Sequence, residues 1–186
     1  MSSLIKGFEA MVPAILILTL AWTLKSMTDS LGAAEYVSGV VANSAAGLQQ
    51  LLPAIIFIVA AFLAFATGTS WGTFGILIPI CIAVFPAAEP LRIISISACM
   101  AGAVCGDHIS PISDTTIMAS AGAECKHVHH VSSQLPYALT VATVSFITFL
   151  IAGFTQQLGI FGSAVVSWIC GISLLAGALY VLKKKF

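Results

Sequence analysis

The stretch Gly106-Asp107-His108-Ile109-Ser110-Pro111-Ile112-Ser113-Asp114-Thr115-Thr116 decides the expected fold, because it is polar and proline-broken yet lies between apolar runs. A carboxylate near the middle of a bilayer costs roughly 2.5–3.5 kcal/mol on insertion scales. A chain that keeps two aspartates there, beside several hydroxyl groups, is expected to use them. The segment therefore indicates an ion pathway.

The composition is that of an integral membrane protein. Of 186 residues, 59% are hydrophobic and 8% are charged, and the mean hydropathy of +1.07 lies far from that of an average soluble domain. The formal net charge is +0, and the few Lys and Arg residues lie at segment ends. This pattern excludes a nucleic-acid-binding surface. The five cysteines are scattered singly, so no disulfide framework is expected.

The apolar runs predict an all-α, polytopic protein with a single transmembrane domain over residues 1–186. A first span is expected over Ala10 to Leu24. The next segment, Leu31 to Gln50, is too polar to face lipid throughout, and we expect an interfacial or bundle-facing helix there. Two ordinary spans close the chain, from Pro136 to about Gly153 and from Gly162 to Leu182.

Leu51 to Pro86 predicts a re-entrant helical hairpin. Its two apolar arms, Pro53 to Ala66 and Phe74 to Phe85, reach about 20 Å each, short of a hydrocarbon core of roughly 30 Å. They are joined by Thr67-Gly68-Thr69-Ser70-Trp71-Gly72-Thr73, and irregular backbone at membrane depth requires shelter by protein or water. The alternative is an ordinary turn between two helices packed through small residues.

The quoted stretch predicts a discontinuous transmembrane helix. We expect one half over Arg92 to Cys105 and the other from about Asp114 to Glu124. Pro111 cannot continue a helix, and Ser113 or Asp114 is a competent N-cap for the half that resumes.

Two such interruptions supply oxygen ligands for a hard alkali cation. The candidate ligands are the carboxylates of Asp107 and Asp114 and the hydroxyls of Thr67, Thr69, Ser70, Thr73, Ser110, Ser113, Thr115 and Thr116. Burial disfavours the charged form of a carboxylic acid, whereas a bound cation favours it. Sodium and a proton are therefore expected to compete for the aspartates. A site that opens alternately to each side then exchanges one ion for the other.

The same residues also have purely structural interpretations. Asp107 and His108 would form only a local pair, and Asp114 would serve only as an N-cap. His108 and Ser110 also lie near Asp107, but no nucleophile-elbow or zinc-protease motif accompanies them, so an enzyme is not expected.

A second polar cluster, Glu124-Cys125-Lys126-His127-Val128-His129-His130, is expected in a short loop after a helix end. Its spacing matches no zinc pattern. We interpret its histidines as solvated interfacial groups, and the alternative is that His127, His129 and His130 sense pH. The lysines at 183–185 place the C-terminus on the cytoplasmic side of the membrane.

Three stretches carry a resemblance to a known family. These are Pro13-Ala14-Ile15-Leu16-Ile17-Leu18 with Leu20-Ala21-Trp22, the segment Ala66 to Thr73, and above all Gly106 to Thr116. They resemble the C-terminal half of the NhaC-type Na⁺/H⁺ antiporters, in the ion-transporter superfamily. The resemblance implies two inverted repeats, each with a re-entrant hairpin and a broken helix, of which this chain is one.

The resemblance implies a secondary transporter, or half of one, in the inner cell membrane, working in Na⁺/H⁺ antiport with Asp107 and Asp114 as the exchanging groups. No cofactor is implied. The expected partners are the lipid bilayer, the transported Na⁺ and H⁺, and a complementary transporter half or a second copy, since the other half is expected to be absent here. Two alternatives stay open: a sodium-coupled exchanger of small organic anions such as malate and lactate, and a non-transporting fragment or accessory subunit. Arg92, the sole arginine, lies at a span end, which argues against a carboxylate clamp.

Overall fold

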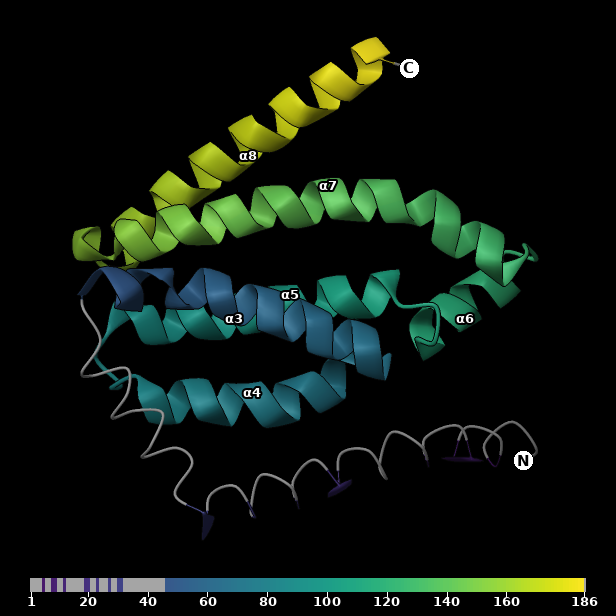
Figure 1. The fold of residues 1–186 in the computed structure, drawn as a ribbon, viewed down its shortest axis with the longest axis horizontal. Coiled ribbons are helices and arrows are strands. Elements are labelled where there is room, and N and C mark those ends of the chain that lie inside the picture. The colour runs from purple at the N-terminus through teal and green to yellow at the C-terminus, as the bar shows by residue number, and fades with distance from the viewer. Residues whose placement is uncertain are drawn as a thin grey trace.

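The computed structural model describes residues 46–185 as continuous chain, together with residues 5, 8, 9, 12, 19, 20, 23, 27, 30 and 31. The continuous part is all-helical (Figure 1). Apart from those isolated positions, the predicted first span, Ala10 to Leu24, lies outside the described residues. The same holds for the part of the predicted polar helix, Leu31 to Gln50, that precedes residue 46.

The predicted hairpin is present as α3 (Ala46–Thr67) and α4 (Ser70–Val84), which run in opposite directions (Figure 1). Gly68 makes the turn with a φ of 68°, a left-handed conformation that glycine adopts without steric cost. The prediction that both arms are too short to span is wrong for the first. At 22 residues α3 is about 33 Å long, and its helix extends upstream past Pro53. Helix α4, with 15 residues, reaches only about 22 Å.

The interrupted helix is also present, as α5 (Pro90–Ile109) and α6 (Asp114–Gly122). The interruption is shorter than predicted, because Asp107 lies in the last turn of α5 rather than in the break. The reason is local: a proline ring crowds the carbonyl four residues earlier, which here is that of Asp107. That carbonyl accepts instead from the Ser110 N–H at 3.1 Å, so the helix ends two residues before Pro111. Glu124, expected to end the second half, lies two residues beyond α6.

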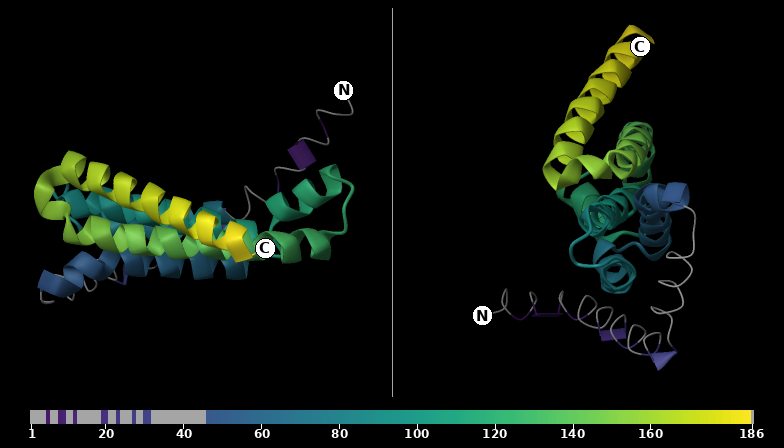
Figure 2. Two further views of the ribbon diagram at one scale, coloured as in Figure 1. Left: turned by 90° about the horizontal axis from the view of Figure 1, so that it is seen from above. Right: turned by 90° about the vertical axis from the view of Figure 1, so that its left-hand side faces the viewer.

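The last two long helices are α7 (His127–Phe154) and α8 (Gly159–Lys185), joined by the short helix η1 (Gln156–Leu158). The prediction that Pro136 opens the first of them is wrong, since Pro136 lies inside α7 and the histidine cluster forms its first turn. Helix α8 leans away from the other helices toward its C-terminal end (Figure 2).

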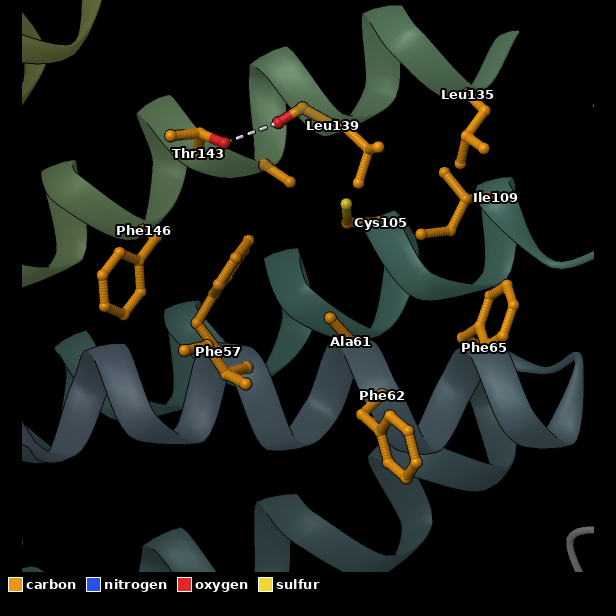
Figure 3. Close-up of a pocket in the computed structure, with 12 residues that line it drawn as sticks. Phe57, Ala61, Phe62, Phe65, Cys105, Ile109, Leu135, Leu139, Thr143 and Phe146 are labelled. Carbon is orange, nitrogen blue, oxygen red and sulfur yellow. Dashed lines mark hydrogen bonds between the residues drawn. The ribbon is translucent and has the colours of Figure 1, made fainter. Parts of the chain in front are cut away.

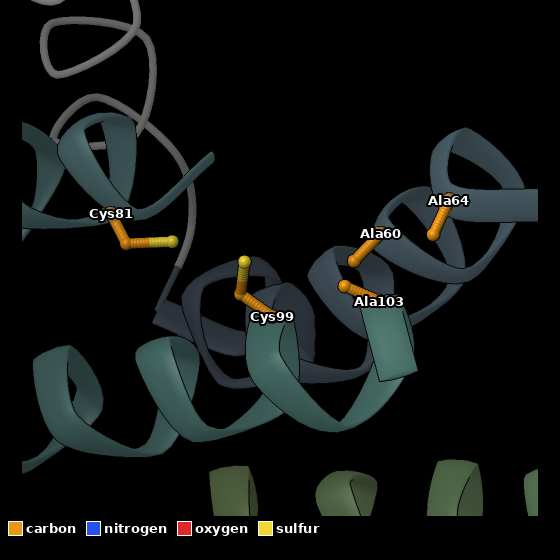
Figure 4. Close-up of a cluster of buried hydrophobic side chains, with 5 residues drawn as sticks. All are labelled: Ala60, Ala64, Cys81, Cys99 and Ala103. Atoms are coloured by element: carbon orange, nitrogen blue, oxygen red, sulfur yellow. The ribbon is translucent and has the colours of Figure 1, made fainter. Parts of the chain in front are cut away.

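Helices α3 and α5 form the centre of the packing. A Cβ added at Gly102 or Gly106 of α5 would overlap the backbone carbonyl of Phe57 or Ala61 of α3, so the two backbones approach to a separation that only glycine allows. Beside them lies a cluster of small buried side chains from α3, α4 and α5: Ala60, Ala64, Cys81, Cys99 and Ala103 (Figure 4). The two thiols behave here as small apolar groups.

Within residues 46–185, four helices are long and apolar enough to cross a membrane: Gln49–Thr67, Pro90–Ile109, His127–Phe154 and Gln156–Lys183. Half of the α5 window is buried inside the protein, against 11% for α7 and 6% for α8. Helix α5 is therefore the central span, and α7 and α8 present most of their apolar surface to their surroundings. The fold is that of a polytopic helical membrane protein.

The α3–α5 contact gives a first testable prediction. Gly106→Ala places a methyl group against the Ala61 carbonyl and is expected to destabilise the protein by about 1–3 kcal/mol, the usual range for overpacking. Gly177→Ala in α8 meets nothing within 4 Å and serves as the control. Thermal unfolding in detergent, followed by size-exclusion chromatography, measures both. Equal melting temperatures for the two variants would contradict the close approach.

Candidate functional site

The site centres on the carboxylate of Asp107, whose side chain is 4% exposed. Ser113 donates a hydrogen bond to Oδ1 at 2.6 Å. The hydroxyls of Ser70 and Thr115 each donate to Oδ2 at 3.4 Å. The Ser113 and Thr115 hydroxyls are themselves 2.7 Å apart. Three segments distant in the sequence thus place hydroxyl groups around one buried acid.

The helices converge so that the end of α3, the start of α4 and the end of α5 lie together at one end of the bundle (Figure 1). The turn after α3 touches the interruption after α5: a Cβ at Gly68 would lie 2.9 Å from the Ile112 carbonyl oxygen. In addition, the Ser110 hydroxyl donates to the Phe65 carbonyl at 2.8 Å. These two contacts hold the interruption against α3 and bring Ser70 within reach of Asp107.

The chemistry of this cluster suits a small cation or a proton. Among residues 46–185, the side chains recorded as bonding the Asp107 carboxylate are all hydroxyls rather than cations. A hydroxyl can donate to an anion or rotate and offer a lone pair to a cation. The carboxylate and its neighbours therefore form a set of hard oxygen ligands with a single negative charge.

The other predicted site residues lie close by but do not bond this carboxylate. Thr73 and Thr116 are buried and bond backbone carbonyls, of Thr69 at 3.1 Å and of His108 at 3.3 Å. Thr67 is exposed and bonds the Leu63 carbonyl at 2.9 Å, and Thr69 is half-buried.

Asp114 is the predicted residue that differs most from Asp107. It is exposed at the first position of α6, and its Oδ1 accepts from the Thr115 N–H at 2.8 Å. An N-cap side chain accepts instead from the N–H two or three residues further on, so this bond does not establish the N-cap role weighed above. The structure does not place the two aspartates in one cluster.

The local pair between Asp107 and His108 is not recorded in the described part of the chain. His108 is exposed, and its Nδ1 is bonded to the Val104 carbonyl at 2.9 Å. The Ser110 hydroxyl is occupied by the Phe65 carbonyl. Within the described residues, no group of three or more His, Cys, Asp and Glu side chains is arranged to hold a metal ion.

The histidines were expected in a loop, but the structure places them in the first turn of α7, in different surroundings. His127, half-buried at the start of α7, has Nε2 at 2.7 Å from the Pro111 carbonyl and Nδ1 at 3.1 Å from the Ser120 hydroxyl. His129 is exposed, and His130 is half-buried. Nothing in the local sequence signals the contact between His127 and the interruption.

An apolar groove of about 530 Å³ lies between α3, α5 and α7 (Figure 3). Phe57, Phe65, Ile109 and Phe146 help to line it, and the hydroxyl of Thr143 is bonded within α7 to the Leu139 carbonyl. The groove is lined almost entirely by apolar side chains and offers no set of oxygen ligands to a hard cation, so the oxygen cluster at Asp107 stays the candidate site.

The fold and the site define a polytopic helical membrane protein with a buried carboxylate beside a helix interruption. The family model described as the Na⁺/H⁺ antiporter family matches residues 1–154, and the chain belongs to that family. The resemblance drawn from the sequence is confirmed at this level.

Three relatives are similar to this chain in sequence. An uncharacterized protein of Haemophilus influenzae is 45% identical over 98% of this chain and 34% of its own length. The malate-2H⁺/Na⁺-lactate antiporter of Bacillus subtilis is 33% identical over 58% of this chain and 24% of its own. The arginine/ornithine antiporter ArcD of Halobacterium salinarum is 32% identical over 61% of this chain and 24% of its own. The chain thus spans about a third or less of the length of these relatives. No solved structure shows significant similarity to it.

The contact between the α3–α4 turn and the interruption gives a second prediction. Gly68→Ala forces a left-handed alanine, which costs about 1–2 kcal/mol, and also drives its Cβ against the Ile112 backbone. Gly177→Ala in α8, which meets nothing within 4 Å, is again the control. Gly68→Ala is expected to lower the melting temperature further than Gly177→Ala. The close approach at Gly68 is refuted if Gly68→Ala is no more destabilising than Gly177→Ala.

Proposed function

We propose that this chain is one half of a secondary antiporter and contributes Asp107, at which Na⁺ exchanges for H⁺. The observation that supports the proposal is the burial of this carboxylate among three hydroxyls. A buried acid without a cationic partner is costly when charged, unless a bound cation or a proton neutralises it.

The exchange requires no covalent step. With a proton on Asp107, the site is neutral and the hydroxyls satisfy the acid by hydrogen bonding. With Na⁺ bound, the carboxylate and the oxygens of Ser70, Ser113 and Thr115 replace part of the ion's hydration shell. Because either ion neutralises the same charge, each displaces the other, and alternate opening to the two sides of the membrane converts this competition into antiport.

The remaining predicted oxygens take supporting roles in this proposal. Thr67, Thr69, Thr73, Ser110 and Thr116 lie on the turn and the interruption around the cluster, where they line the ion's path or fix the backbone. Asp114, exposed at the start of α6, acts as a second carboxylate on that path.

A second transporter half is part of the proposal. Helices α7 and α8 expose most of their apolar surface, and this chain covers about a third of the length of its H. influenzae relative. Inverted-repeat carriers form their site at the interface of two halves. We infer that a complementary half, or a second copy in opposite orientation, completes the site in the cell membrane, with the C-terminal lysines on the cytoplasmic side.

The proposal predicts a graded loss of exchange among carboxylate variants. In membrane vesicles containing the assembled transporter, Asp107→Asn is expected to abolish sodium-driven proton flux, because the amide carries no exchangeable charge. Asp114→Asn is expected to reduce it. Glu89→Gln, an exposed carboxylate before α5, is the control and keeps the flux. Sodium-driven flux that survives both aspartate changes would refute the proposal.

Ser113→Ala tests the hydroxyls separately. A hydrogen bond to a charged group contributes about 1.5–3 kcal/mol, and 1.4 kcal/mol corresponds to about a tenfold change in affinity. The half-saturating Na⁺ concentration is therefore expected to rise at least about tenfold. Unchanged sodium dependence in a folded Ser113→Ala protein would remove this residue from the ligand set.

A second candidate, sodium-coupled exchange of small carboxylates, is favoured by the likeness to the malate-2H⁺/Na⁺-lactate antiporter. Arg92 lies in the first turn of α5 and Asp107 in its last, some 15 residues or about 22 Å apart along the helix. The single arginine of this chain therefore does not form an anion site beside Asp107. Inhibition of sodium flux by added malate would favour this candidate, with any carboxylate-binding groups then supplied by the other half.

A further inference from the structure

The imidazole of His127 connects the interrupted segment to two helices. Its Nε2 lies 2.7 Å from the Pro111 carbonyl oxygen, and its Nδ1 lies 3.1 Å from the Ser120 hydroxyl in α6. A carbonyl oxygen only accepts hydrogen bonds, so Nε2 carries a hydrogen and donates it. One side chain at the start of α7 thus contacts both the interruption and the helix that follows it.

The backbone between α6 and α7 is shaped to make this contact. Glu124 adopts a φ of 52°, a left-handed conformation that is unfavourable for a residue with a Cβ. The next residue, Cys125, donates its N–H to the Ser120 carbonyl at 3.1 Å. This tight corner folds the start of α7 back toward α6 and places His127 opposite Pro111.

The interruption is held from both sides. Ser110 is bonded to the Phe65 carbonyl of α3, and Pro111 is bonded to His127 of α7. Ser113, two residues after Pro111, makes the shortest recorded hydrogen bond to the Asp107 carboxylate, at 2.6 Å. The direction of the Ser113 side chain therefore depends on a short backbone segment with one anchor on each neighbouring helix.

We propose that His127 is a positioning residue for the cation site. Its Nε2–H donates to the Pro111 carbonyl, which lies in the interruption and has no helical partner. This bond fixes the backbone of the interruption and thereby directs the Ser113 hydroxyl at Asp107. This inference rests on the proposed function. It assigns His127 a role through Ser113 and no contact with the ion itself.

The test uses two substitutions at one position in the assembled transporter. His127→Leu removes the donor and keeps the bulk, whereas His127→Gln keeps an N–H donor at a comparable reach. At fixed pH, His127→Leu is expected to raise the half-saturating Na⁺ concentration about two- to tenfold with little change in maximal rate, the range for one lost hydrogen bond. His127→Gln is expected to restore the wild-type value. His129→Leu, at an exposed position in the same turn, is the control.

Amide hydrogen exchange provides a readout that is independent of transport. Residues 110–116 are expected to exchange faster in His127→Leu than in His127→Gln or the wild type. Wild-type sodium dependence and exchange in His127→Leu would overturn the inference, as would a folded His127→Gln protein with the full defect of His127→Leu. If the wild type itself shows no sodium-coupled flux, the proposed function fails, and the hydrogen exchange alone decides whether His127 holds the interruption.

Discussion

The site depends on the inability of Pro111 to continue α5. In an unbroken helix, residues six or eight positions apart do not face one another, because neighbours on a helix surface are three or four apart. Ser113 lies six residues after Asp107 and Thr115 lies eight after it, yet both hydroxyls bond the Asp107 carboxylate. The break therefore does more than expose backbone groups. It turns the chain so that the hydroxyls that follow the helix fold back over the acid at its end.

The glycines of α5 supply the second requirement. At Gly106 the α3 backbone approaches α5 so closely that no side chain fits between them, and Asp107 is the next residue in the same turn. This approach seats the end of α3 and the first turn of α4 beside the break, where Ser70 completes the ring of hydroxyls. The same packing that stabilises the helix pair thus buries the carboxylate.

The sequence predicted the hairpin, the interrupted helix and the polytopic class, because Pro111, Gly68 and long apolar runs act locally. It misplaced the starts of α3 and α7. Pro53 and Pro136 were each interpreted as a helix start, but a long apolar helix tolerates one missing N–H in its interior.

The site was predicted as ten oxygen-bearing residues, and whether each of them contributes to ion binding stays a prediction. The structure gathers Ser113 and Thr115 around Asp107 through the break at Pro111, whereas Ser70 joins them only because of how α3 crosses α5, which its own local sequence does not encode. The contact of His127 with Pro111 depends on a left-handed Glu124, a conformation that a sequence signals through glycine or asparagine but not through glutamate.

The absence of a recorded cationic partner for Asp107 among the described residues bears directly on the proposed exchange. An arginine or lysine beside the acid would neutralise it permanently, and a transported cation would then add an uncompensated positive charge. Hydroxyls carry no net charge, so the site holds a charge of minus one when empty and zero when it holds either one proton or one Na⁺. In a low-dielectric interior the empty state and the doubly occupied state are both penalised. Under the proposed function, exchange of one ion for the other would then be the favoured path through the site, and the coupling of the two ions would follow from charge balance rather than from any contact between them.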